Sequence, residues 1–220
     1  MPCAAIIVAS GSSRRMGFDK LAAPLMGRPV LRMTVEAFMA AESVSRVIVV
    51  CPEERLDSLL AGDFPKPLTR VEGGAERCES VMSGLEALRP GDELVAVHDG
   101  ARPLVTSSAI NLCVTEAEKH GAATLARPIT ETIKRADEKG FSDGGVDREG
   151  LWHTETPQIF RTELLLKAYD VVAARGVPVT DEVSAMELIG IPTKLVSSAG
   201  PNLKITHSGD IELATALCAG

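Results

Sequence analysis

The sequence has no apolar run long enough to cross a membrane. Its apolar stretches, such as Val47–Val50, fall far short of the roughly 20 residues that a membrane-spanning helix needs. The N-terminus is apolar but carries no basic residue ahead of its apolar stretch, so no secretory signal is expected. Aromatic residues make up only 3% of the 220 residues, and the core is therefore expected to consist of Val, Ile, Leu and Ala. These features predict an ordinary folded protein without membrane contact.

Positive charge is also scarce. The 23 Lys and Arg residues are outnumbered by 30 Asp and Glu residues, which gives a formal net charge of −7 at pH 7. No run of Lys and Arg supplies the basic face that nucleic-acid binding along the chain would require. Nucleic acid is therefore excluded as a partner, and an anionic ligand has to be attracted by a local cluster of cations.

Paired cysteines are missing. The five cysteines are odd in number, widely scattered and without a C-x-x-C pair: Cys3, Cys51, Cys78, Cys113 and Cys218. This spacing favours reduced thiols over disulfides and argues against a zinc site. It predicts a cytoplasmic protein.

Short apolar segments alternate with segments of helical period. The expected strands are Cys3–Val8, Arg46–Val50, Thr69–Val71, Glu93–Val97 and Ala122–Ala126, and helices are expected near 29–41, 53–61, 76–88 and 107–119. Several strands are apolar at consecutive positions, which is typical of strands buried on both faces. Pro29 suits a first helical position, and Thr106 suits an N-cap. The alternation predicts an α/β fold with a doubly wound, mostly parallel sheet.

The alternation stops after Pro128. Polar strand patterns at Thr130–Arg135 and Leu151–Thr156 flank a stretch rich in Asp, Lys and Gly, so residues 130–156 are expected to form a β-arm. After it the pattern predicts a helix over 162–175, a capped helix after Asp181, a strand at Thr193–Val196 and a closing helix from Ser208. The whole chain, 1–220, is interpreted as one domain with an inserted arm.

The loop after the first strand is rich in Gly, Ser and basic residues, and it runs from Ala9 through Ser10, Gly11, Arg14 and Arg15 to Lys20. Such a loop can approach phosphate oxygens closely, and phosphate-binding loops occupy this position in α/β sheets. It lacks the G-K-[ST] of a Walker loop and the G-x-G-x-x-G of a dinucleotide fold. A surface loop with solvated basic residues is the alternative interpretation.

A second polar cluster, His98-Asp99-Gly100-Ala101-Arg102-Pro103, directly follows a buried strand. Ligands bind beyond the carboxyl ends of parallel strands, so Asp99 and Arg102 are placed to meet one. A carboxylate there suits Mg²⁺, which binds one or two carboxylates together with substrate phosphates. Asp99 could equally cap its own turn. For His98 we favour a structural role as a hydrogen-bonded residue at the end of the strand.

Three further features are weak individually. Glu72-Gly73-Gly74 precedes the helix that carries Ser80, and its glycines permit close approach of a base or sugar, although it is also an ordinary turn. The arm carries Thr132 and Arg148, with Thr156 at its return, and these could simply stabilise the arm. Lys204 alone is typical of a surface lysine.

The order of these motifs is more informative. From Ala5 to Thr206, the first loop, Gly73-Gly74-x-x-Arg77, His98–Pro103, Asp147-Arg148, Thr156-Pro157-Gln158, Thr180-Asp181-Glu182 and Asn202–Thr206 follow one another. In this order they resemble the 2-C-methyl-D-erythritol 4-phosphate cytidylyltransferase family. The resemblance implies a Rossmann-like nucleotidyltransferase fold with a protruding β-arm, and a homodimer whose arms exchange between subunits.

The resemblance also implies the reaction and its residues. A sugar-alcohol phosphate attacks the α-phosphorus of CTP and releases pyrophosphate, in the non-mevalonate route to isoprenoid precursors. Arg15 and Lys20 match the transition-state cations, and Asp99 lies near Mg²⁺ as a ligand or through water. The positions that match the nucleotide pocket are Ala9, Ser10, Gly11, Gly74 and Ser80. Those that match the pocket for the alcohol phosphate are Arg102, Thr132, Arg148, Thr156 and Lys204.

The sequence departs from the family pattern at three positions. Ser10 stands where Ala is common, Ala75 stands where many relatives carry Asp, and Pro201 stands where an acidic residue is usual. With Pro201, a carboxylate near the alcohol phosphate or the metal is either missing or supplied from elsewhere in the chain. Two other functions remain open, a ribitol-5-phosphate cytidylyltransferase and a non-catalytic nucleotide-binding regulator. The stretch from Val146 to Trp152 favours methylerythritol phosphate, and the presence of both Arg15 and Lys20 argues against a regulator.

Overall fold

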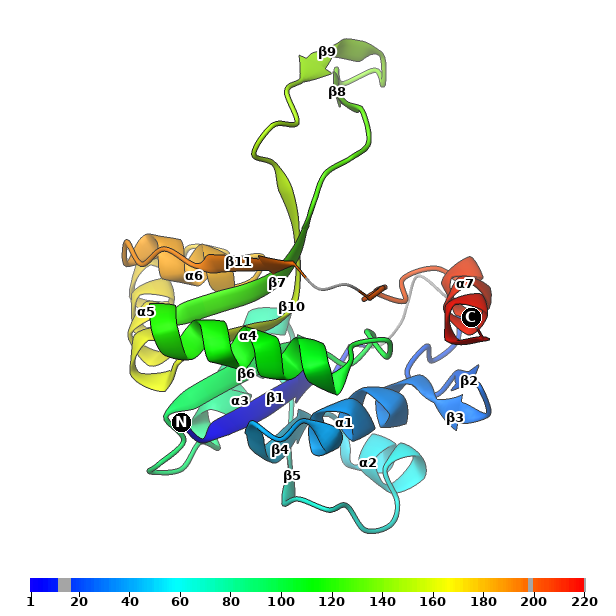
Figure 1. The fold of residues 1–220 in the computed structure, drawn as a ribbon, viewed down its shortest axis with the longest axis vertical. Coiled ribbons are helices and arrows are strands. Elements are labelled where there is room, and N and C mark those ends of the chain that lie inside the picture. The colour runs from blue at the N-terminus through cyan, green and yellow to red at the C-terminus, as the bar shows by residue number, and fades with distance from the viewer. Residues whose placement is uncertain (12–16, 198–199, 220) are drawn as a thin grey trace.

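A seven-stranded sheet forms the centre of the computed structural model, which describes residues 1–11, 17–197 and 200–219 (Figure 1). The strands lie in the order β11-β7-β10-β6-β1-β4-β5. Their bounds are Cys3–Val8 (β1), Val44–Val50 (β4), Leu68–Val71 (β5), Leu94–Asp99 (β6), Ala122–Pro128 (β7), Trp152–Arg161 (β10) and Lys194–Ser197 (β11). Only β10 runs antiparallel to its neighbours, β6 and β7. The predicted doubly wound, mostly parallel sheet is confirmed.

Helices cover both faces of this sheet. The face that packs with Cys3, Ala5 and Ile7 is covered by α1 (Val30–Ala40), α2 (Glu53–Leu59) and α4 (Ser107–His120). The opposite face, which contains Ile6, is covered by α3 (Arg77–Glu86), α5 (Thr162–Arg175) and α6 (Glu182–Leu188). Burial on both faces explains why β1 is apolar at consecutive positions. No helix in the described ranges is long and apolar enough to span a bilayer.

Local sequence signals set most helix ends. The Thr106 side chain accepts the Ala109 N–H at the start of α4, as predicted, and Gly121 ends that helix with φ of 84°. At the start of α3, Glu76 and Glu79 form a reciprocal capping box. Pro29 is the N-cap of α1 rather than its first helical residue, so the helix begins at Val30, one residue later than expected.

Several strand boundaries differ from the expectation. β6 continues beyond Val97, because His98 and Asp99 still pair with Ile7 and Val8 of β1. A two-stranded hairpin of β2 (Pro24–Leu25) and β3 (Arg28–Pro29) was not predicted. Its two-residue turn places Met26 at φ 51° and Gly27 at φ 78°, the left-handed conformation that tight hairpin turns require.

The arm departs from the central sheet between β7 and β10 and carries a hairpin of β8 (Ile133–Ala136) and β9 (Ser142–Val146) at its end (Figure 1). The returning strand was expected to end at Thr156, but β10 continues to Arg161. Its second half lies between β6 and β7 in the sheet and is therefore buried. Phe141 near the tip of the arm is 70% exposed. The closing helix α7 (Gly209–Ala219) contributes Ala214 to the core.

A buried ion pair joins the amino-terminal edge of the sheet. Arg46 on β4 and Asp92 in the turn before β6 have side chains that are 6% and 8% exposed, and Nη2 of Arg46 lies 2.5 Å from Oδ2 of Asp92. The Arg89 N–H also donates to Asp92, at 2.7 Å. Burial opposes ionisation of Asp92, but these hydrogen bonds outweigh it and lower the pKa of the carboxyl group. The pair therefore stabilises the fold as a carboxylate and a guanidinium.

Asp92→Ala is expected to lower the free energy of unfolding by about 3–5 kcal/mol, since it leaves the Arg46 charge buried and unpaired. Because the folded-state pKa is lowered, the stability that comes from ionised Asp92 is fully present above the unfolded pKa of about 3.9 and is lost as the pH falls from there through the lower folded-state pKa. Urea unfolding at pH 7 and at pH 3 measures both effects. The control is Asp57→Ala at an exposed site on α2, and equal stability of the two variants at pH 7 would contradict the assignment.

Candidate active site

The parallel strands β1 and β6 end side by side, because Val8 pairs with Asp99 in the sheet. From β1 the chain winds outward through β4 and β5, and it then returns to form β6 on the other side of β1. In open α/β sheets, ligands bind at such a switch point, beyond the carboxyl ends of the strands. The loops that follow β1, β5 and β6 therefore define the candidate site.

Asp99, the last residue of β6, lies among three cations. Nζ of Lys204 is 2.8 Å from its Oδ2, and Nε of Arg102 is 3.5 Å from the same oxygen. Nε of Arg77 lies 3.3 Å from its Oδ1. Burial alone would raise the pKa of Asp99, but Arg77, followed by Lys204 and Arg102, outweighs burial and holds the pKa well below its usual range. Asp99 is therefore ionised, as a cation-binding role requires.

His98 lies beneath this cluster as a structural residue, in agreement with the sequence-based interpretation. Its ring is fully buried, 4.8 Å from the Phe38 ring, and burial lowers its pKa to about 3. Nδ1 lies 3.0 Å from the Thr156 hydroxyl, and Nε2 lies 3.3 Å from the Arg102 carbonyl. Both contacts are satisfied by a neutral ring that accepts at Nδ1 and donates from Nε2.

Thr156 braces the end of β6. Its hydroxyl oxygen accepts the Asp99 N–H at 3.1 Å, and its carbonyl accepts the Asn202 side-chain amide at 2.7 Å. The residue is only 4% exposed. The structure therefore places Thr156 behind Asp99, and its expected contact with substrate stays a prediction.

Ser10, in the loop after β1, meets Ser80 of α3, the helix that follows the loop after β5. The hydroxyls of Ser10 and Ser80 are 2.7 Å apart, and Ser80 is fully buried. A β-carbon added at Gly73 would overlap the Ser10 side chain and would lie 3.0 Å from Oγ of Ser80. One added at Gly74 would overlap Glu79 of the capping box. Gly73 thus allows its loop to pack directly against Ser10, and Gly74 allows the same loop to pack against the start of α3.

Lys20 lies where the first loop meets the segment after β11. Its ammonium group donates to the carbonyl of Ile205 at 2.9 Å, and the Ile205 N–H donates to the Ala101 carbonyl at 2.8 Å. Ile205 follows Lys204 in the chain, so the two lysines approach the site from adjoining segments. Arg55 of α2 steadies the same loop, since it donates to the Ala9 carbonyl and pairs with Asp19 at 2.9 Å.

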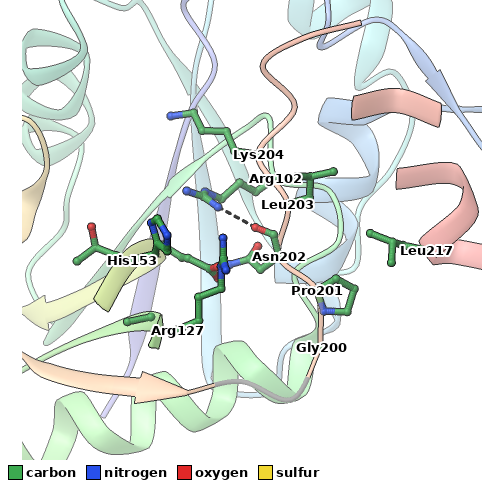
Figure 2. A pocket seen from close by; sticks show the side chains of 12 residues that line it. Arg102, Arg127, His153, Gly200, Pro201, Asn202, Leu203, Lys204 and Leu217 are labelled. Carbon is green, nitrogen blue, oxygen red and sulfur yellow. Dashed lines mark hydrogen bonds and ion pairs between the residues drawn. The ribbon is translucent and has the colours of Figure 1, made fainter. Parts of the chain in front are cut away.

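A cavity of about 400 Å³ adjoins the Asp99 cluster (Figure 2). Arg102, Arg127 and Lys204 line it together with Asn202 and His153. Arg102 crosses its wall and donates to the Asn202 carbonyl at 2.7 Å. Nε of Arg102 and Oδ1 of Asn202 are buried without a hydrogen-bond partner among the described residues. Among the described residues that line it, Glu155 is the acidic one and pairs with Arg127 at 3.3 Å, so cationic side chains predominate and the cavity suits an anionic ligand.

The remaining predicted residues are not brought to this cavity. Thr132 and Arg148 lie exposed on the arm, where Arg148 donates to the Thr130 carbonyl. Pro201 lines the cavity in place of the acidic residue common in the family pattern. Gly11 is exposed with open space around it. Arg15 lies outside the described residues.

The described residues offer no preformed metal site. They contain no cluster of three or more His, Cys, Asp or Glu side chains that could hold an ion. Asp99 supplies one carboxylate, with its Oδ2 facing Lys204. This donor set fits Mg²⁺ only when the ion is shared with substrate phosphates, which is the usual arrangement for that metal.

Comparisons with known proteins agree with this geometry. A family model described as 2-C-methyl-D-erythritol 4-phosphate cytidylyltransferase matches residues 3–219. The protein of that name from Prochlorococcus marinus is 42% identical over 219 residues, which cover 97% of either chain. The structure of the Thermus thermophilus protein of that name is similar at a TM-score of 0.82 and 30% identity, with 100% of both chains covered. The 4-diphosphocytidyl-2C-methyl-D-erythritol synthase of Anaerococcus prevotii gives a TM-score of 0.86 at 28% identity, with 99% of this chain and 96% of that chain covered.

This chain belongs to the 2-C-methyl-D-erythritol 4-phosphate cytidylyltransferase family. The predictions of an enzyme, of a nucleotidyltransferase and of CTP-dependent cytidylyl transfer in the non-mevalonate pathway are thereby confirmed. The family assignment favours methylerythritol phosphate over ribitol 5-phosphate, and an enzyme over a non-catalytic regulator.

Sequence reasoning gave no role to several residues of this cytidylyltransferase site. Arg77 and Glu182 lie within motifs of the family pattern that do not by themselves indicate a role, and Arg55 lies in none of those motifs. Arg77 donates to both oxygens of Glu182, 105 positions away in the chain. A contact across that separation leaves no local pattern in a single sequence.

Gly73→Ala is expected to raise the KM for CTP about tenfold or more, because misplacing binding groups by ~1 Å can reduce activity up to 10²-fold. The added methyl group would push the loop after β5 away from Ser10 and Ser80. Steady-state kinetics with CTP varied measures this change. Gly209→Ala, in open space at the start of α7, is the control. An unchanged KM for CTP in Gly73→Ala would show that the contact between the two loops is not part of the nucleotide site.

Proposed function

We propose that this enzyme joins CTP and 2-C-methyl-D-erythritol 4-phosphate. A phosphate oxygen of the alcohol phosphate forms a bond to the α-phosphorus of CTP, and the bond to pyrophosphate breaks. The products are 4-diphosphocytidyl-2-C-methyl-D-erythritol and pyrophosphate. The observation that carries this proposal is the cluster of Lys204, Arg102 and Arg77 around Asp99, beside a cavity at the carboxyl edge of the sheet.

The reaction needs no general base from the protein. The second pKa of a phosphate monoester is about 6, so the nucleophile is already an anion at neutral pH. His98, the histidine of the cluster, is buried and engaged at both ring nitrogens, which agrees with the absence of a base. The enzyme therefore has to align the two substrates and to stabilise the additional negative charge of the transition state.

Cations from the first loop are proposed to stabilise that charge. Lys20 approaches the segment that carries Lys204 through its hydrogen bond to Ile205. We assign Lys20 and Arg15 to the α-phosphate and its bridging oxygens. Preorganised charges of this kind act on the transition state without further reorganisation.

The nucleotide is proposed to bind between the loops after β1 and β5. Cytosine presents a donor amine and two acceptors, which backbone groups of Ala9, Ser10, Gly11 and Gly74 and the Ser80 hydroxyl can match. The close packing of Gly73 against Ser10 supports a narrow pocket. Such a pocket accepts a pyrimidine more readily than a purine.

The alcohol phosphate is proposed to occupy the cavity lined by Arg102 and Lys204, with Thr156 behind Asp99. Mg²⁺ would be held by Asp99 and the triphosphate, where it would neutralise phosphate charge as the reaction proceeds. The protein's part is to keep Asp99 ionised, which its ion pairs with Arg77, Lys204 and Arg102 do.

A homodimer with exchanged arms is proposed to complete each site. Thr132 and Arg148 are exposed on an arm that extends away from its own sheet (Figure 1). A two-stranded hairpin is only marginally stable alone, and Phe141 on this one is 70% exposed, which supports packing against a second copy. Thr132 and Arg148 would then reach the alcohol phosphate in the partner's site.

A cytoplasmic location is proposed from the thiols. All five cysteines are free, and three of them, Cys3, Cys51 and Cys113, are buried. Burial raises the pKa of Cys3 to about 12 and keeps its thiol protonated. Unpaired thiols of this kind are typical of reducing compartments.

The proposed function predicts pyrophosphate release only when the enzyme, CTP, Mg²⁺ and methylerythritol phosphate are combined. A pyrophosphate assay measures this, with the product identified by mass spectrometry. ATP, GTP and UTP in place of CTP, and ribitol 5-phosphate in place of the alcohol phosphate, are the controls. Faster turnover of ribitol 5-phosphate would overturn the substrate assignment.

Lys20→Ala is expected to lower kcat by about 10²–10³-fold, the scale for loss of one preorganised charge. Arg148→Ala is expected mainly to raise the KM for the alcohol phosphate, with CTP binding unchanged. If arms exchange, a mixed dimer of the two variants contains one site with both Lys20 and Arg148 intact. Mixing therefore restores activity, which is measured after subunit exchange. If the mixed dimers, verified by mass, show no recovery of activity, sites are not shared between subunits. The control for Lys20→Ala is Lys167→Ala, on the exposed face of α5.

A further inference from the structure

Glu182 is a buried carboxylate close to the site that the proposed mechanism does not use. It is the first residue of α6 and is completely inaccessible to solvent. Its Oε1 accepts from Nη1 of Arg77 at 2.7 Å and from the Tyr169 hydroxyl at 3.0 Å, and its Oε2 accepts from Nη2 of Arg77 at 3.0 Å. A fully buried carboxylate is costly unless it is paired, and here both oxygens are paired.

The same guanidinium reaches Asp99. Its Nε, the nitrogen not used by Glu182, lies 3.3 Å from Oδ1 of Asp99. Arg77 therefore bridges two carboxylates with three nitrogens. This leaves Oδ2 of Asp99 to face Lys204 at 2.8 Å.

Glu182 determines which nitrogen of Arg77 can pair with Asp99. Guanidinium and carboxylate groups prefer a two-pronged pairing with both oxygens. Arg77 cannot make that pairing with Asp99 while Glu182 holds its two outer nitrogens. Without the charge on Glu182, Asp99 would be the carboxylate that still pairs with Arg77, and the fork would turn onto both of its oxygens.

α6 is itself fixed to the end of β10. The side-chain oxygen of Gln158 accepts the N–H groups of Glu182 and Val183, at 2.9 and 3.1 Å. The side-chain amide of Gln158 donates to Asp181 at 2.9 Å. The position of Glu182 is thus set by the same strand that carries Thr156, the residue that braces Asp99 from behind.

We propose that Glu182 is a positioning residue, which restricts Arg77 to one oxygen of Asp99. The other oxygen, which pairs with Lys204 at 2.8 Å, is thereby kept free of Arg77 and retains a lone pair for the metal ion of the nucleotide. This inference rests on the proposed function only in assigning Asp99 to the metal-bound nucleotide. The arrangement of Arg77 between Glu182 and Asp99 is independent of that assignment.

The test is Glu182→Gln, which keeps the size of the side chain and removes its charge. Arg77 retains Asp99 as a partner and is 30% exposed, so the variant leaves no unpaired buried charge. We expect Mn²⁺ binding in the presence of CTP alone, followed by electron paramagnetic resonance, to weaken about 10-fold or more, the scale for loss of a residue that orients a metal ligand. The Mg²⁺ concentration for half-maximal turnover is expected to rise by a similar factor. A crystal structure of the variant is expected to show both outer nitrogens of Arg77 on Asp99.

Two further variants separate positioning from a purely structural role. Glu187→Gln makes the same change at an exposed position of α6 and is expected to match the wild type. The double variant Arg77→Gln/Glu182→Gln removes the competing guanidinium together with the carboxylate. If Arg77 causes the defect, the double variant binds Mn²⁺ more tightly than Glu182→Gln alone, whereas loss of a structural contact would make it no better than the single variant.

The outcomes are distinguishable from failure of the proposed function. A wild-type enzyme that releases no pyrophosphate from CTP and the alcohol phosphate refutes the proposed function, while the position of Arg77 in the variant crystal still tests the inference. Wild-type Mn²⁺ binding in Glu182→Gln, an unmoved Arg77, failure of that variant to fold, or a double variant without recovery would each overturn the positioning role.

Discussion

The ionised carboxylate of Asp99 is the constraint on which the site depends. Arg77, Arg102 and Lys204 come from α3, from the loop after β6 and from the segment after β11, and like charges at such close quarters repel one another. Asp99 makes their approach possible because it attracts all three, at 2.8 to 3.5 Å. With Glu182 included, three cations face two carboxylates, so the cluster keeps one net positive charge although the whole chain carries −7. A local surplus of this kind can attract phosphates to an acidic protein.

The sheet and its supports place that carboxylate. Asp99 is a strand residue in register with Val8, and its N–H is bound by Thr156 from the neighbouring antiparallel strand. The neutral state of His98 belongs to the same arrangement. A protonated ring directly below the cluster would add a fourth cation beside Arg102, and burial prevents this by lowering the pKa of His98 to about 3. Backbone pairing and a neutral histidine thus fix the geometry, while the cations supply the chemistry.

The sequence allowed prediction of those parts of the structure that depend on local pattern. Consecutive apolar residues identified β1 and β4, and Thr106 marked the start of α4. The loops at the carboxyl edge followed from their position after buried strands. The insertion of β10 into the sheet was missed because its first half is polar and exposed, so the apolar pattern starts only near its buried second half. The link between Arg77 and Glu182 was missed because it joins residues 105 positions apart. The assignment of Arg15, the single-domain interpretation of 1–220 and the arm contacts stay predictions.

The structure divides the site between rigid and projecting parts, and the chemistry explains that division. A reaction that depends on aligning two anions needs its cations fixed before the substrates arrive, since reorientation during the reaction would lose the benefit of preorganisation. Arg77 meets that need because a capped helix carries it and because Asp99, at the end of β6, pairs with it at 3.3 Å. A hydroxyl-rich substrate has to enter and leave, and the cavity beside Lys204 and Arg102 is lined mainly by strand ends and loops, with Leu217 of α7. Under the proposed exchange of arms, Arg148 would approach from a second chain, so the cavity would be completed by assembly rather than by folding of one chain.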